Sequence, residues 1–97
     1  MTIWVKKGVQ GDLAPVAQKG FGRVCRAIED RGKDVFVTSI RDGNHMPGSF
    51  HDIGLAFDID YPKGWNTGLK IAIEEAAGKG WQFIYHKTHI HAEYDTV

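Results

Sequence analysis

Residues 55–59 read Leu-Ala-Phe-Asp-Ile, and residues 88–94 read Thr-His-Ile-His-Ala-Glu-Tyr. In both stretches apolar and polar residues alternate, which is typical of a β-strand with one face in the core. Phe57 should point to the core and Asp58 away from it. Ile90 should likewise face the core, whereas the histidines and Glu93 share the other face. The two stretches predict neighbouring parts of a sheet whose second face carries ionisable groups.

The remaining elements follow from local signals around these strands. Apolar residues recur at helical spacing from Leu13 to Ile28, with Asp12 as the predicted N-cap, Pro15 in the first turn, and closure at Gly32. Gly20 and Gly22 weaken this helix or allow close packing. The sequence further predicts strands at 35–39 and 81–85, loops at 40–49 and 61–66, a tight turn near Lys87, and a second helix that Asn66 or Thr67 caps and Gly78 and Gly80 end.

These elements predict one α+β domain over residues 1–97, with a small antiparallel sheet packed against two helices. Lys plus Arg and Asp plus Glu number 12 each, so there is no basic field for nucleic acid. The single cysteine, Cys25, cannot form an internal disulfide and should be a buried, inert thiol. No apolar stretch is long enough for a secretory signal or a membrane span, so we expect synthesis in the cytoplasm and no membrane insertion. We also expect a monomer.

Four of the five histidines lie in two short runs, at 51 and at 86–91, and His45 lies just upstream. Histidine nitrogens and one carboxylate are the ligands that suit a catalytic Zn2+ ion. Gly54 permits a sharp bend after His51, and Asp60 is a rival to Asp58 as the carboxylate. An exposed histidine-rich strand is the alternative interpretation.

The segment Ser49-Phe-His51-Asp-Ile-Gly54-Leu-Ala56-Phe-Asp58 resembles the Ser-x-His-x-x-Gly-x-Ala-x-Asp signature of zinc D-alanyl-D-alanine carboxypeptidases and L-alanyl-D-glutamate endopeptidases. The stretch 89–95 resembles the His-x-His strand of the same group, which shares the hedgehog/DD-peptidase fold. The short chain looks most like the versions that bacteriophages encode. The resemblance covers roughly residues 35–95.

By position, the resemblance implies that the zinc ligands are His51, Asp58 and His91. It also implies an active-site imidazole at His89 and an arginine at Arg41, whose fork suits a substrate carboxylate or carbonyl. Ser49 and His45 are then candidates for substrate contacts, although a loop-capping hydroxyl and a solvated histidine account for them equally well.

Some relatives place an acidic general base three residues before the final ligand, where this chain has Thr88. Three residues therefore remain candidates for the general base: His86, His89 and Glu93. We assign proton transfer to His89, assisted by His86. The competing interpretation makes His89 a fourth zinc ligand, which would close the site.

The resemblance implies hydrolysis of an amide bond in peptidoglycan stem peptides, as an endopeptidase or a DD-carboxypeptidase. We expect a role in phage lysis, with access to the cell wall through a holin or as part of a virion. Two alternatives remain: a cytoplasmic D-alanyl dipeptidase, and a noncatalytic module that zinc stabilises or that binds the wall.

Overall fold

The computed structural model describes residues 3–5, 7, 13–40 and 54–95. Along the chain the elements are β1 (Ile3–Val5), α1 (Pro15–Glu29), β2 (Val35–Ser39), β3 (Ala56–Ile59), α2 (Thr67–Ala77), β4 (Trp81–Tyr85) and β5 (Ile90–Tyr94). This is the predicted order of elements, with β1 added at the start. The α+β class is confirmed.

The five strands form one mixed sheet in the order β1-β2-β3-β5-β4. Strands β2, β3, β5 and β4 pair antiparallel, but β1 pairs parallel to β2, with Trp4 opposite Phe36. The prediction of a purely antiparallel sheet was therefore wrong, and β1 was missed. The reason is physical: a three-residue apolar run has no periodicity, and only its partner strand makes it part of a sheet. The stacked rings of Trp4 and Phe36, 6.3 Å apart, extend this pairing to the side chains.

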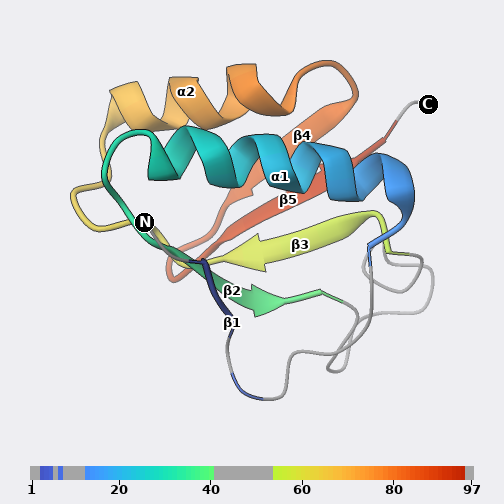
Figure 1. The fold of residues 1–97 in the computed structure, drawn as a ribbon, viewed down its shortest axis with the longest axis horizontal. Coiled ribbons are helices and arrows are strands. Elements are labelled where there is room, and N and C mark those ends of the chain that lie inside the picture. Colours follow the sequence, from blue (N-terminus) through green and yellow to red (C-terminus); the bar gives the residue numbers. More distant parts are fainter. Residues whose placement is uncertain (1–2, 6, 8–12, 41–53, 96–97) are drawn as a thin grey trace.

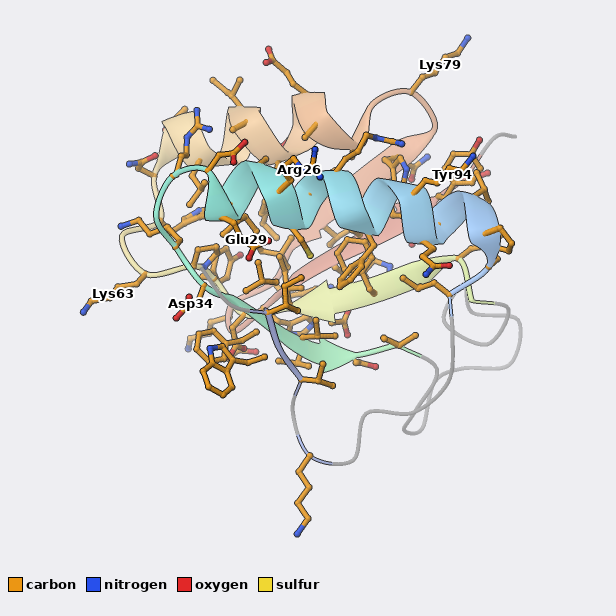
Figure 2. The ribbon with its side chains drawn as sticks, in the orientation of Figure 1. Arg26, Glu29, Asp34, Lys63, Lys79 and Tyr94 are labelled. Carbon is orange, nitrogen blue, oxygen red and sulfur yellow. The ribbon has the colours of Figure 1, made fainter. Side chains whose placement is uncertain are left out.

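Both helices pack side by side on one face of the sheet, and the core lies between them and the strands (Figure 1). Long charged side chains such as Lys63 and Lys79 point away from the body of the domain (Figure 2). The buried cluster contains Val24, Cys25 and Ile28 of α1, Leu69, Ile73 and Ala77 of α2, and Val35, Val37, Phe57, Ile59, Ile90 and Ala92 of the sheet. Phe57, Ile90 and Ala92 are strand residues that the alternating pattern assigned to the core. Burial of Cys25 is also confirmed.

Helix α1 begins at Pro15 with Ala14 as its N-cap, and the backbone N–H of Ala14 donates to the carbonyl of Gly54. The prediction that Asp12 caps this helix was wrong, and Asp12 itself lies outside the described residues. Helix α2 begins after Asn66, whose side chain accepts from the N–H of Leu69, so Asn66 rather than Thr67 is the cap.

Gly20 lies on the buried side of α1 against the indole of Trp81. A Cβ atom there would lie 2.5 Å from Nε1 of Trp81 and closer still to two carbons of the ring. The close approach that the sequence suggested for this glycine is therefore real. Gly22 is different, because no described atom other than its chain neighbours and the backbone of its own helix lies within 4 Å of the position of its absent Cβ.

Candidate functional site

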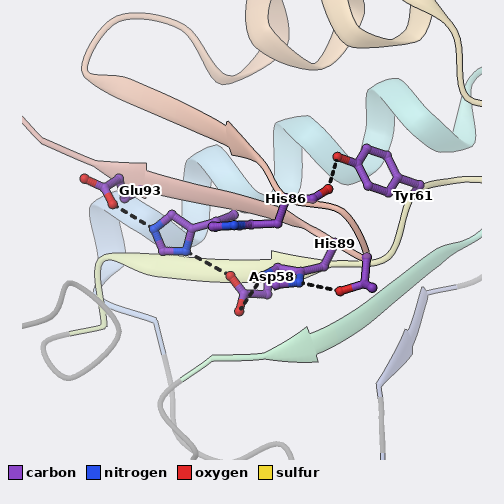
Figure 3. A network of polar contacts seen from close by, with 7 residues as sticks. Asp58, Tyr61, His86, His89 and Glu93 are labelled. Atoms are coloured by element: carbon purple, nitrogen blue, oxygen red, sulfur yellow. Dashed lines mark hydrogen bonds and ion pairs between the residues drawn. The ribbon is translucent and has the colours of Figure 1, made fainter. Parts of the chain in front are cut away.

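The predicted polar groups gather on the face of the sheet opposite the helices, over strands β3 and β5 (Figure 3). Asp58 and His91 are direct partners in the antiparallel ladder between these strands. Directly opposed side chains on the same face of a sheet lie about 5 Å apart at Cβ, so the pairing itself brings these two groups together. A register shift in β2 falls opposite Asp58, where Ser39 is its partner.

The bend before β3 is set by Gly54, whose φ of 74° lies in the left-handed region that glycine favours. The sharp bend predicted at this position is confirmed. Two residues later Ala56 is fully buried opposite Glu93. Its small side chain leaves the space beside Glu93 to the larger polar groups on β5.

The imidazole of His91 lies between two carboxylates. Its Nδ1 is 2.9 Å from Oδ1 of Asp58, and its Nε2 is 2.7 Å from Oε1 of Glu93. All three side chains are largely buried, with exposed fractions between 13% and 19%. Burial alone would lower the pKa of His91, but the hydrogen bonds and charges of Asp58 and Glu93 outweigh it and raise the pKa above its usual value. Without a metal, this cluster favours a protonated His91.

His86 and His89 flank the tight turn between β4 and β5, which the N–H of His86 closes by donating to the carbonyl of His89. The turn predicted near Lys87 is thus confirmed. The rings of His86 and His89 stack with centroids 4.6 Å apart, and the ring of His86 lies 6.4 Å from that of His91. Nε2 of His89 is 3.9 Å from Oδ2 of Asp58. The imidazoles of His89 and His91 therefore both approach the carboxylate of Asp58, and the ring of His86 lies beside them.

Thr88 and Tyr61 fix this turn in ways that residue spacing did not reveal. Oγ1 of Thr88 lies 3.1 Å from Nδ1 of His89, so this hydroxyl orients the ring and leaves its Nε2 toward Asp58. The hydroxyl of Tyr61 donates to the carbonyl of His86 over 2.5 Å. The hydroxyl of Thr88 cannot serve as a general base in the way that an acidic side chain can. Its position beside His89 could have been inferred, because the two residues are adjacent in the chain. Nothing in the sequence links Tyr61 to a carbonyl 25 residues away.

Of the predicted site residues, Asp58, His86, His89 and His91 are brought together in the described part of the chain. The other four predicted residues, Arg41, His45, Ser49 and His51, lie outside the described residues. Within the described ranges, no group of three or more His, Cys, Asp or Glu side chains is arranged to hold a metal ion. The rival carboxylate, Asp60, is exposed just beyond β3.

No protein-family model matches the chain, and no curated protein sequence is significantly similar to it. Neither of the two described helices combines the length and the hydrophobicity that crossing a bilayer demands. Functional inference therefore depends on the sequence signature and on the geometry around Asp58.

Proposed function

We propose that this protein is a zinc-dependent peptidase that hydrolyses an amide bond in peptidoglycan stem peptides. The observation that carries the proposal is the approach of Asp58 and His91, two predicted zinc ligands that are 33 positions apart in the chain, to 2.9 Å. His89 and His86, the predicted proton-transfer groups, lie on the same side of the sheet. The resemblance to the hedgehog/DD-peptidase group supplies the substrate class.

Two of the three proposed donors, Asp58 and His91, fit zinc in chemistry. A carboxylate oxygen and a neutral imidazole nitrogen are ordinary zinc ligands, and at tetrahedral angles two such atoms lie about 3.3 Å apart. Asp58 Oδ1 and His91 Nδ1 are 2.9 Å apart, a few tenths of an ångström less than this spacing. Metal binding requires that His91 lose its proton, so affinity should rise with pH. In this proposal His51 supplies the third ligand.

Zinc held by these residues would supply Lewis acidity toward a substrate carbonyl and lower the pKa of water. The chain's own contribution is proton transfer and positioning. Nε2 of His89 is the imidazole nitrogen beside Asp58, and Thr88 orients the ring through Nδ1. His89 is thus placed to take a proton from water and to pass it to the leaving amine. The imidazole of His86, stacked on His89, would stabilise negative charge that develops on the carbonyl oxygen.

Arg41 is proposed to bind a carboxylate or carbonyl of the stem peptide, with Ser49 and His45 as further substrate contacts. The competing assignment of His89 as a fourth ligand stays open, because 3.9 Å between His89 Nε2 and Asp58 Oδ2 is compatible with either role. The two assignments differ in what happens when His89 is removed.

The test combines zinc analysis of the purified protein with digestion of purified peptidoglycan, followed by mass spectrometry of the released peptides. We expect about one zinc per chain and chelator-sensitive cleavage of one peptide bond. Asp58→Ala should lose zinc and activity, whereas the matched control Asp60→Ala should keep both. His89→Ala should keep zinc and lose most activity.

Three outcomes would count against these assignments. Loss of zinc in Asp60→Ala but not in Asp58→Ala would show that the wrong carboxylate had been chosen. Release of zinc by His89→Ala, with retention in His91→Ala, would reverse the ligand assignment on β5. Stoichiometric zinc without cleavage of any type of wall would overturn the enzyme and favour the noncatalytic zinc-stabilised module.

A further inference from the structure

The second nitrogen of His91 has a partner that the zinc-ligand assignment does not use. Nε2 lies 2.7 Å from Oε1 of Glu93, on the opposite side of the ring from the Asp58 contact at Nδ1. The imidazole therefore lies between two carboxylates, those of Asp58 and Glu93, which are labelled in Figure 3. A neutral imidazole has one nitrogen with a free lone pair, so the group that holds hydrogen on one nitrogen decides that the other is available to a metal.

We propose that Glu93 is a positioning residue that holds the proton of His91 on Nε2 and so presents Nδ1 to the metal. The inference rests on the proposed function, because it assumes that His91 is a zinc ligand. Both carboxylates can only accept hydrogen bonds, so neutral His91 must direct its one hydrogen toward Glu93 or toward Asp58. A metal held between Asp58 and Nδ1 would leave that hydrogen on Nε2, where Glu93 accepts it. The lone pair is then on Nδ1, which points at Asp58. A carboxylate behind a ligating histidine also raises its basicity and its affinity for metal.

The backbone keeps Glu93 in this place. Glu93 follows His91 by two residues on β5, so both side chains project from the same face of the strand. Strand β5 is paired on both sides, with Ala56 of β3 and Gln82 of β4 as the partners of Glu93. A strand held by two ladders has little freedom to turn, and the small side chain of Ala56 leaves room for the carboxylate.

This geometry gives Glu93 a role different from that of the general base. Nδ1 and Nε2 point to different sides of the imidazole, so a metal held by Nδ1 and Asp58 would lie on the side of the ring away from Glu93. Proton transfer therefore falls to His89 and His86, which lie on the Asp58 side.

The experiment measures Zn2+ affinity by competition with a chromophoric chelator for the parent protein, Glu93→Gln, Glu93→Ala and the control Glu75→Gln, whose exposed glutamate is on α2. We expect Glu93→Ala to bind Zn2+ about 10- to 100-fold more weakly than the parent, and the control to match the parent. Glu93→Gln should lie between the parent and Glu93→Ala, because its amide oxygen can still accept from Nε2–H but carries no charge. The isosteric Glu93→Gln guards against a loss that only reflects a damaged fold. Circular dichroism confirms that each variant is folded.

A second readout separates positioning from a general structural effect. In the zinc-loaded parent, two-bond proton–nitrogen correlation spectra should show His91 with hydrogen on Nε2 and metal on Nδ1. The Nε2 proton should exchange slowly with water, and in Glu93→Ala it should exchange rapidly or be absent. Zinc affinity within twofold of the parent in both Glu93 variants, or metal on Nε2 in the parent, would overturn the proposal.

The failure of this proposal is distinguishable from that of the proposed function. Zinc binding that depends on Glu93 in a protein that cleaves no peptidoglycan would overturn the peptidase and support the positioning role. Cleavage of peptidoglycan by a protein whose zinc affinity does not depend on Glu93 would support the peptidase and overturn the positioning role. A parent protein that binds no Zn2+ would overturn both.

Discussion

Replacing Gly20 with alanine should destabilise the protein, although alanine is the better helix former. The added Cβ would lie 2.5 Å from Nε1 of Trp81 and closer still to two ring carbons, where ordinary carbon contacts are about 3.5–4.0 Å. The indole cannot simply swing away, because it packs against Phe57 and Tyr94 with ring centroids 5.6 Å and 5.7 Å distant. Something must shift by about 1 Å.

The net change in the free energy of unfolding is the cost of overpacking minus the gain in helix propensity. Overpacking a well-filled core costs about 1–3 kcal/mol. Replacing glycine by alanine inside a helix returns at most about 1 kcal/mol. We therefore expect Gly20→Ala to lower the free energy of unfolding by about 1–2 kcal/mol. Gly22→Ala is the matched control on the same helix, two residues away. It should raise the free energy of unfolding by about 0.5–1 kcal/mol, because no described atom beyond its chain neighbours and the backbone of its own helix lies within 4 Å of the new methyl group.

Urea denaturation followed by circular dichroism measures both values, and equal m-values would show that the unfolded states are comparable. In a domain of this size 1 kcal/mol corresponds to about 4–8 °C in Tm, so thermal scans should separate the two variants clearly. The reasoning fails if Gly20→Ala proves as stable as Gly22→Ala. That result would mean that α1 does not lie against Trp81 as described.

Two further predictions concern the second helix and the buried thiol. Asn66→Ala removes the N-cap of α2 and should lower the free energy of unfolding, measured by urea denaturation, by about 1 kcal/mol. Thr67→Ala should lower it by less, and equal losses in the two variants would contradict the cap assignment. Burial, and to a smaller extent the charge of Glu29, raises the pKa of Cys25 from 9.0 to about 12. At pH 8 about one native molecule in ten thousand is thiolate, so the native thiol should resist an alkylating reagent. The thiol should react once the chain unfolds. Rapid labelling of the native protein would show that Cys25 is accessible. Because the folded pKa is the higher one, the stabilising contribution of Cys25 is complete below about pH 9 and declines as the pH rises toward 12.

The faces of the two central strands were predictable because alternation is a local property. Phe57, Ile90 and Ala92 are buried, and Asp58 and His91 lie on the other face, as the period of two requires. The second helix and its C-terminal Gly78 were predictable for the same reason, since caps and periodicity act within a few residues.

Contacts between distant residues were not predictable in this way. Strand β3 lies between β2 and β5 rather than beside β4, the strand that follows it in the chain, and this order makes Asp58 the direct partner of His91. The resemblance grouped these two residues as ligands, but it did not state that Glu93 would hold the opposite nitrogen. The bond from Tyr61 to the His86 carbonyl likewise depends on where the loop before α2 passes the β4–β5 turn.

The sequence by itself therefore determined the described elements other than β1, the buried faces of the two central strands and the chemical types of the candidate ligands, because each of these depends on neighbouring residues. The tertiary structure decided which strands pair and in which register. That choice depends on the burial of the whole core and places β1 parallel to β2, a pairing that a three-residue run cannot specify. It also decided that one imidazole lies between two carboxylates, since only the register of β3 and β5 brings Asp58 to the Nδ1 side of a ring that Glu93 holds at Nε2.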